Sequence, residues 1–343
     1  MPVRVTTASR RRTGIEPASR LSPGTGLKTG RVTSHLLAGR SMNPMLTGPV
    51  AGMEYRRATA GGADYLLATA GRGSPVLLLH GFPQTHFCWR GVVPTLSRSH
   101  AVIAPDLRGY GASTAPAGGA HGEGFSKRDM ANDLVELMGD LGFQRFTVVG
   151  HDRGARVGYR LALDHAGTVE RLVILNVIPT LDQFERMGAG PSLGYWPWFL
   201  LAQPAPFPEL LIAGAPEQFL RFIFSTWPSD PQAIDAAAFT EYRAALTEPT
   251  IASMCADYRA SFWIDRDHDA ADRRAGHRIE CPVLLVTGGD ESQLADAQTV
   301  WRSWARDLRA TVLPGGHFIP EEAPEQLARE LVEFLDGESS HPN

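Results

Sequence analysis

The chain has 343 residues, of which 43% are hydrophobic and 20% charged, the balance of a globular protein that can bury a sizeable core. No stretch reaches the roughly 18 consecutive apolar residues of a membrane helix, so the composition excludes a membrane span as well as gross disorder. The length is compatible with two domains, or with a single α/β core that carries an inserted lid.

The net charge of -4 conceals two different parts of the chain. Residues 1–45 contain eight basic residues and one acid, Glu16, which leaves 25 basic and 36 acidic residues, about -11, for the remainder. That acidic remainder argues against a nucleic-acid partner. We interpret residues 1–50 as a disordered basic tail. The alternative is upstream sequence included by a misplaced start, because Met42, Met45 and Met53 all precede the first convincing strand.

The cysteine usage points to a reducing compartment. Cys88, Cys255 and Cys281 lie far apart, are odd in number and match no metal-ligand spacing. We therefore expect a cytoplasmic protein without a metal site.

From about residue 53, short β-rich runs alternate with helical stretches, as in a mostly parallel sheet covered on both faces. Met53–Thr59 and Ala63–Ala70 predict a leading hairpin that turns at Gly61 and Gly62. Continuous apolar runs predict the buried central strands, which are Val76–Leu79, Ala101–Ala104, Phe146–Val149, Leu172–Leu175 and Val283–Val286.

Helical periodicity appears in Lys127–Leu141, behind the candidate N-cap Ser126, and again in Glu321–Phe334. The stretch from Leu181 to about Arg274 breaks the alternation, because it is rich in Pro, Trp and Phe and has no strong strand candidate. We expect a helical cap at 181–275, inserted between core segments 51–180 and 276–343. Its helix-length segments are Glu217–Phe224, Pro231–Leu246 and Ile251–Phe262.

The most informative motif follows the strand at Phe146. Gly150-His-Asp152-Arg-Gly154 places an aspartate between two glycines, which relieve crowding when the central residue occupies a strained turn at a strand end. This pattern predicts a nucleophile elbow with Asp152 in the place where lipases carry serine. The alternative is a purely structural role, in which the segment is a strand-ending turn and the aspartate caps a helix.

Two further turns complete a candidate site. His80-Gly-Phe82-Pro83 directly follows a buried strand, and the backbone N–H groups of Phe82 and Arg153 can form an oxyanion hole, to which Pro83 cannot contribute. Gly315-Gly-His317 follows the last strand. The order of the nucleophile first and the histidine last is typical of the α/β-hydrolase arrangement.

Together these segments resemble the haloacetate and fluoroacetate dehalogenases of the α/β-hydrolase fold. The likeness spans about residues 53–337 and rests on six motifs: HGFPQT at His80–Thr85, DLRGYG at Asp106–Gly111, HDRGAR at His151–Arg156, LAQPAP at Leu201–Pro206, DYR at Asp257–Arg259 and GHFIPEEAP at Gly316–Pro324.

The resemblance implies a two-step reaction that needs no cofactor. In that family the elbow aspartate displaces halide to give an ester, and the histidine then activates water to cleave it; Asp152 and His317 match these residues. Arg153 and Arg156 match the arginines that hold the substrate carboxylate. Trp198 and Tyr258 match two halide ligands, and the resemblance also suggests dimerisation through the cap.

The chain departs from the family at two positions. The third halide ligand, a histidine, is replaced by Pro197, which lowers the expectation of fluoride release relative to chloride or bromide. The family's triad acid is replaced by Asn176, which cannot stabilise an imidazolium by charge. We expect Asp290, which follows the next core strand, to be the acid instead, with Asn176 as the alternative position and Glu291 as a rival.

The leading hypothesis is a hydrolase that removes halide from a short 2-haloacid, a small-molecule substrate. The alternative is an epoxide hydrolase, in which Asp152 opens the ring and Tyr258 donates to the oxygen. The position of Asp290 favours this alternative, whereas Arg156 argues against it. A third hypothesis, a weakly active homologue that acts as a binding protein, is supported only by Asn176.

Overall fold

The computed structural model describes residues 50–188, 191–291 and 294–337, which belong to one compact unit, Asn43–Asn343. Apart from Val50, the expected tail lies outside the described residues. The eight strands form one sheet in the order β1-β2-β4-β3-β5-β6-β7-β8, in which β1 and β2 run antiparallel to their neighbours and the others are parallel. The strands are β1 Glu54–Ala60, β2 Ala63–Ala70, β3 Ser74–Leu79, β4 His100–Pro105, β5 Phe146–His151, β6 Val169–Leu175, β7 Val283–Gly288 and β8 Leu308–Leu313.

The predicted hairpin and all five predicted central strands are confirmed. Every residue of β5 is buried, and Val76–Leu79 of β3 are buried as well, because helices cover both faces of the sheet. The order of the strands reverses around β3, which has β4 on one side and β5 on the other. The turns after β3 and β5 therefore meet at a topological switch point, where open α/β sheets place their ligand sites.

The core helices divide between the two faces, because right-handed crossovers that run in opposite directions place their helices on opposite sides of a sheet. Helices α2 and α3 pack together on one face, and α1 packs with α14 on the other. These core elements are η1 His86–Gly91, α1 Val93–Leu96, α2 Lys127–Asp140, α3 Arg153–Asp164, α12 Ala297–Trp304, α13 Ile319–Glu322 and α14 Pro324–Asp336. Ser126 caps α2 as predicted by accepting the Asp129 N–H at 3.1 Å. The helix expected at Glu321–Phe334 is divided between α13 and α14, because a new helix begins at Pro324, which has no N–H to donate.

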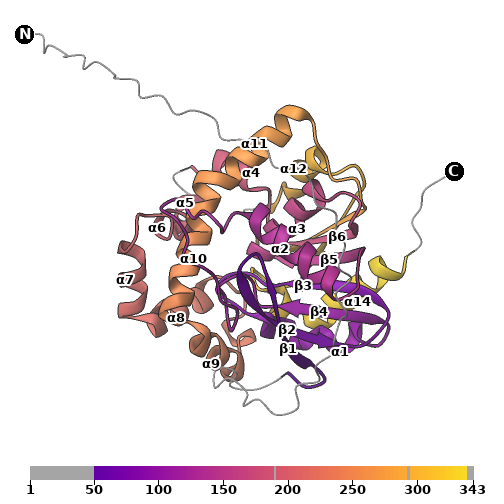
Figure 1. Ribbon diagram of the computed structural model, residues 1–343, viewed down its shortest axis with the longest axis horizontal. Helices are drawn as coiled ribbons and strands as arrows, with labels where there is room; N and C mark the ends of the chain where they lie inside the picture. Colours follow the sequence, from indigo (N-terminus) through magenta and orange to yellow (C-terminus); the bar gives the residue numbers. More distant parts are fainter. Residues whose placement is uncertain (1–49, 189–190, 292–293, 338–343) are drawn as a thin grey trace, which may run out of the picture. The chain divides into compact units, whose positions relative to one another are not determined.

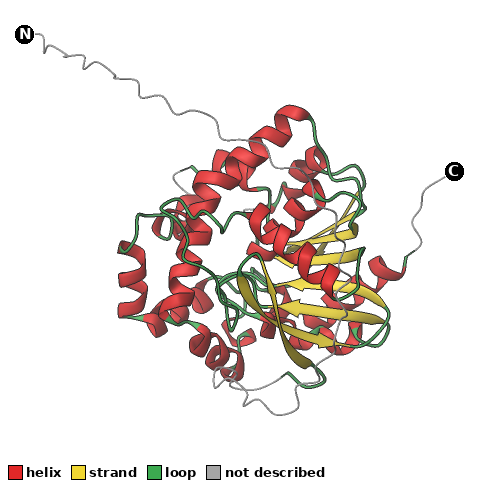
Figure 2. Cartoon of the chain, viewed as in Figure 1, coloured by secondary structure: helices red, strands yellow, loops and turns green. Residues whose placement is uncertain are grey.

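Between β6 and β7 the described chain is helical, and these elements lie to one side of the sheet (Figures 1 and 2). They are α4 Thr180–Glu185, α5 Pro191–Gly194, α6 Trp196–Leu200, α7 Phe207–Gly214, α8 Pro216–Thr226, η2 Pro231–Ala233, α9 Ala236–Ala245, α10 Glu248–Ala260, the π-helix η3 Ser261–Asp265 and α11 Arg266–Ala275. The segment expected as one helix at Pro231–Leu246 is interrupted, because Asp235 caps a new helix by accepting the Ala238 N–H. This arrangement supports a cap at 181–275, a boundary that stays a prediction. No helix among the described residues is long and apolar enough to cross a membrane.

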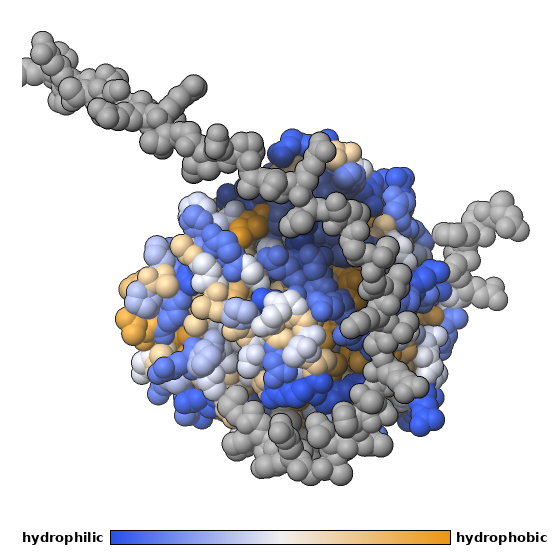
Figure 3. Space-filling view, viewed as in Figure 1, coloured by the Kyte–Doolittle hydropathy of each residue, from blue (hydrophilic) through white to orange (hydrophobic). Residues whose placement is uncertain are grey.

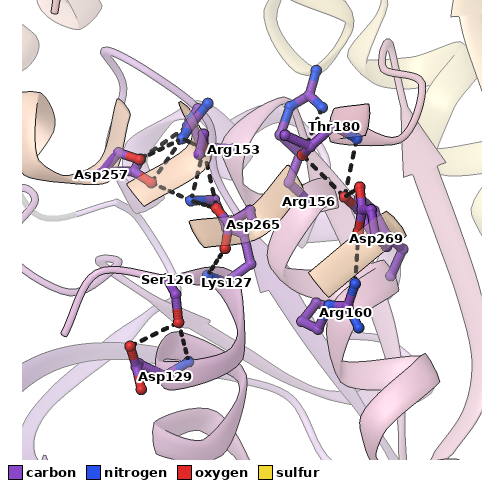
Figure 4. Close-up of polar contacts among 12 residues, drawn as sticks. Ser126, Lys127, Asp129, Arg153, Arg156, Arg160, Thr180, Asp257, Asp265 and Asp269 are labelled. Atoms are coloured by element: carbon purple, nitrogen blue, oxygen red, sulfur yellow. Dashed lines mark hydrogen bonds and ion pairs between the residues drawn. The ribbon is translucent and has the colours of Figure 1, made fainter. Parts of the chain in front are cut away.

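A buried cluster of charges joins the cap to the core (Figure 4). Asp257 of α10 accepts two hydrogen bonds from the guanidinium of Arg153 on α3, at 2.8 and 2.9 Å, and also pairs with Lys127 of α2. Tyr110 donates a further bond of 2.7 Å to the same carboxylate. Although burial opposes ionisation, Arg153 and Lys127 hold the pKa of Asp257 well below its usual value. The cap is thus held in place by a buried ion network, in which the loss of one partner would leave the others unpaired.

Candidate active site

The proposed nucleophile lies in a strained turn between β5 and α3. Asp152 adopts a positive φ of 46°, a region that non-glycine residues rarely occupy. The flanking glycines are required by close packing: a Cβ on Gly154 would lie 2.3 Å from the Leu79 carbonyl oxygen, and one on Gly150 would lie 2.5 Å from Ala155 Cα. The local sequence therefore builds the elbow, and the strained turn presents the Asp152 carboxylate at the carboxyl end of the sheet.

A cavity of about 310 Å³ collects most of the residues expected at the site. Asp152, Arg156, Trp198, Tyr258 and His317 all line it, although they come from four different segments of core and cap. The residues weighed as the triad acid, which are Asn176, Asp290 and Glu291, also border this cavity. The sequence prediction of a shared site is therefore supported in space, whereas the chemical roles stay predictions.

The backbone of Phe82 contacts the nucleophile directly. Its N–H donates to Asp152 Oδ2 at 3.0 Å, and the backbone N–H of Arg153 opens α3 immediately after Asp152. His80 supports this turn, since its Nδ1 donates to the Gly81 carbonyl and its Nε2 accepts the Leu107 N–H. Burial lowers the pKa of His80 to about 4, so the ring stays neutral in this structural role.

The surroundings of Asp152 favour its ionised form. Burial by itself would raise the pKa of this carboxyl, but the neighbouring His317, Arg153, His151 and Arg156 more than compensate and hold it below the ordinary value of 3.8. An ionised carboxylate near neutral pH is the form that can act as a nucleophile.

The two arginines of α3 differ in their partners. The guanidinium of Arg153 is bound by Asp257 and also donates to Ser261 Oγ at 2.6 Å, which leaves its Nη1 without a partner. Arg156 donates from Nη1 to the Ile178 carbonyl at 2.9 Å and to Thr180 Oγ1 at 3.2 Å. Within the described residues no carboxylate lies within 4 Å of the Arg156 guanidinium. Figure 4 shows this group together with that of Arg153.

The pKa values of the two guanidinium groups therefore shift in opposite directions. Burial alone lowers the pKa of both, but Asp257 reverses this for Arg153, whereas the pKa of Arg156 remains below its usual value. A buried, unpaired guanidinium at a cavity wall is a site for an anion, and its planar fork matches a carboxylate.

Trp198 and Tyr258 stand beside these arginines. The Arg156 guanidinium lies 4.5 Å from the centre of the Trp198 ring, and that of Arg153 lies 4.2 Å from the centre of the Tyr258 ring. Burial and the Asp152 charge raise the pKa of Tyr258, so its hydroxyl keeps its proton and remains a donor. Pro197 also lines the cavity, without a donor to offer.

His317 is held through its backbone, while one ring nitrogen remains available. Its N–H donates to the Trp227 carbonyl at 3.2 Å, and its own carbonyl accepts from His151 Nε2 and Asn176 Nδ2. Among the described residues its buried Nε2 has no hydrogen-bond partner. Such a nitrogen on a cavity wall can take a proton from a water molecule.

The geometry favours Glu291 over the predicted Asp290 as the acid. Glu291 Oε1 lies 3.9 Å from His317 Nδ1, and among the described residues it is the only carboxylate within 4 Å of this ring. Asp290 is exposed, and its Oδ2 instead accepts a hydrogen bond of 2.6 Å from Ser229 Oγ of the cap. Burial raises the pKa of Glu291, an effect that the nearby His317 opposes.

Asn176 binds backbone rather than the imidazole. Its amide nitrogen donates to the carbonyls of Gly316 and His317, and its Oδ1 accepts the Gly288 N–H at 2.7 Å. It therefore joins the end of β7 to the histidine loop, a structural contribution that sequence reasoning missed. The contacts of Trp227 with His317 and of Ser229 with Asp290 were missed as well, because no local pattern marks them.

Comparisons with known proteins agree with this geometry. Residues 74–324 match the family model of the alpha/beta hydrolase fold. The chain is 40% identical to a fluoroacetate dehalogenase of Burkholderia sp over 288 residues, 83% of this chain and 94% of that protein. It is 33% identical to a soluble epoxide hydrolase of Corynebacterium sp. (strain C12) over 292 residues, 82% of this chain and 96% of that protein.

A solved structure supports the same assignment. A putative alpha/beta hydrolase from Nostoc sp PCC 7120 superposes with a TM-score of 0.81 at 41% identity, covering 84% of this chain and all of that one. The elbow, the sheet order and these similarities lead to one conclusion: the chain belongs to the alpha/beta hydrolase fold family.

Proposed function

We propose that the protein hydrolyses the carbon–halogen bond of short 2-haloacids. The single observation that carries this proposal is Arg156, a buried guanidinium without a carboxylate partner among the described residues, on the cavity that also contains Asp152. A haloacid carboxylate would supply the missing negative charge. It would also hold the halogen-bearing carbon beside the nucleophile.

In the first step Asp152 Oδ1 attacks the carbon that bears the halogen, the carbon–halogen bond breaks, and halide leaves with the bonding electrons. Trp198 Nε1 and Tyr258 Oη are the donors for the departing halide. Asp152 Oδ2 becomes the carbonyl oxygen of the ester, held by the Phe82 N–H. In the second step His317 takes a proton from water as the water oxygen attacks the ester carbonyl carbon. The bond from that carbon to the substrate oxygen then breaks, His317 returns the proton to this oxygen, and the hydroxy acid leaves. The second proton of the water is released as the Asp152 carboxylate forms again.

Epoxide hydrolysis is the second candidate. It is favoured by the Corynebacterium relative and by a buried tyrosine, Tyr258, that keeps its proton on the cavity wall. An epoxide without a carboxylate would leave the Arg156 charge unpaired, so we place this reaction second.

The three cysteines are free, in keeping with a cytoplasmic location, which fractionation of cells with an antibody would test.

Substrate charge gives the first test, because the acid and the amide of one haloacetate differ mainly in that charge. We expect the wild-type protein to prefer chloroacetate over chloroacetamide. Arg156→Gln should lower kcat/KM for chloroacetate by about 100-fold, the size of a lost charge-assisted hydrogen bond, and leave chloroacetamide much less affected. Arg221→Gln, at an exposed arginine of the cap, is the matched control. A variant at Arg156 that keeps the full preference for the acid would contradict the proposal. Turnover of epoxides without turnover of haloacids would make epoxide hydrolysis the first candidate.

The acid is tested at the two neighbouring carboxylates. Glu291→Gln should slow ester hydrolysis on the order of 100-fold, because it removes the charge beside His317. Asp290→Asn should have a smaller effect, because the amide oxygen can still accept from Ser229. Rapid-quench measurement of ester decay distinguishes the two, and a larger loss in Asp290→Asn would restore the assignment made from sequence.

The first step should be independent of pH around neutrality. Asp152 has a pKa below 3.8, so the rate of halide release in the first turnover should stay constant from about pH 8 down to about pH 5. Stopped-flow measurements of halide release across this range check that the rate is constant. A first step that loses rate between pH 8 and pH 6 would show that Asp152 is not the ionised nucleophile.

We also propose a homodimer formed through the cap. Phe207, Leu210 and Leu211 on α7 and Phe222 on α8 are each at least half exposed, and Figure 3 shows hydrophobic surface at α7. Light scattering should give twice the chain mass, and Leu210→Asp should lower it to one chain without loss of kcat. Val312→Asp, at an exposed residue of the edge strand β8, is the control. A monomeric wild-type protein would refute the dimer.

A further inference from the structure

The loop that carries His317 is fastened to a short segment of the cap, Trp227–Asp230, between α8 and η2. The Trp227 carbonyl accepts the His317 N–H at 3.2 Å. The Trp227 ring also meets the imidazole edge-on, with 5.1 Å between ring centres. Gly316 packs so closely here that a Cβ would lie 2.7 Å from the Ser229 nitrogen. The position of the proposed base is therefore set partly by the cap.

Glu322 of α13 binds both segments with one carboxylate. Its Oε1 accepts the Phe318 N–H at 2.9 Å, and its Oε2 accepts the Gly316 N–H at 2.9 Å and the Ser229 N–H at 2.7 Å. The two residues that flank His317 are thus held by the same side chain that holds the cap segment. Hydrogen bonds to an ionised carboxylate are about twice as strong as neutral ones, so this group is a firm connection.

A second connection runs through Ser229. Its hydroxyl donates to Asp290 Oδ2 at 2.6 Å, next to Glu291 on the loop after β7. The cap segment is therefore tied to the loop of His317 and to the loop of the carboxylate nearest that ring. Asp152 does not depend on these ties, because its position is set by the elbow and by the Phe82 N–H.

We propose that Glu322 and Ser229 are positioning residues that hold His317 for the ester-hydrolysis step. The inference rests on the proposed function, since only a reaction with two half-reactions separates their effects. Loss of either tie leaves the attack of Asp152 on the haloacid intact. It slows the attack of water, because the imidazole must be positioned correctly relative to the ester carbonyl to take the proton from water.

The test follows both half-reactions after the enzyme is mixed with excess bromoacetate. Bromide is measured by ion chromatography, and the ester on the Asp152 peptide is measured by mass spectrometry, at successive quench times. Glu322→Gln should slow ester decay by about 10- to 100-fold, and Ser229→Ala by about 3- to 10-fold, while the rate of first bromide release stays within about twofold. Ester should accumulate to nearly one per chain in Glu322→Gln.

Matched controls are available at exposed positions close by. Glu325→Gln changes a glutamate three residues further along, and Ser225→Ala removes a hydroxyl that donates to the Phe222 carbonyl within α8. Both should behave as wild type. Should Glu322→Gln fail to fold, as judged by circular dichroism and by the absence of first bromide release, Ser229→Ala decides alone, because its side chain is exposed.

Equal slowing of bromide release and ester decay would overturn the inference, because it would indicate a general structural effect. Unchanged ester decay in Ser229→Ala and in any folded Glu322→Gln protein would overturn it too. Failure of the wild-type protein to release bromide is a separate result, which would refute the proposed function itself.

Discussion

The site depends on how two buried positive charges on one helix are balanced. Arg153 and Arg156 lie three residues apart at the start of α3, yet Asp257 neutralises only the first. The paired arginine fixes the cap on the core, and the unpaired one faces the cavity that contains Asp152. One helix end therefore serves the architecture and, in the proposed reaction, would also bind the substrate carboxylate, so that an acidic body would hold an anionic substrate through local geometry rather than through its overall field.

The cap and the core contribute to the chemistry together. The core supplies Asp152, the Phe82 N–H and His317, whereas the cap supplies Trp198, Tyr258 and the segment that fastens the histidine loop. This division fits the proposed reaction in two steps. In that reaction the elbow and the leaving-group donors would serve bond breaking at carbon, and the fastened loop would serve the later attack of water.

Much of the site could be predicted from sequence where a short segment determines the geometry. The glycines around Asp152 and the apolar run before them imply the elbow, and the Gly-Gly-His segment after the last strand places His317 at the same edge. The contacts of Glu322 and Ser229 could not be predicted in this way, because they depend on how separate loops approach one another. For the same reason the sequence locates the turn after β7 but cannot choose between Asp290 and its rival Glu291, because the contact of Asp290 with Ser229 depends on the folded cap.

The proposed reaction depends on a covalent ester on Asp152, and oxygen labelling detects whether this ester forms. The protein is allowed to turn over chloroacetate in ¹⁸O-water, and the peptide that contains Asp152 is then analysed by mass spectrometry. Attack of water on the ester carbonyl places ¹⁸O in the Asp152 carboxylate, so we expect labelled peptide, with unlabelled oxygen in the product of the first turnover. Label in the hydroxy acid from the first turnover, with none in Asp152, would show direct attack of water on the substrate and would exclude the covalent ester.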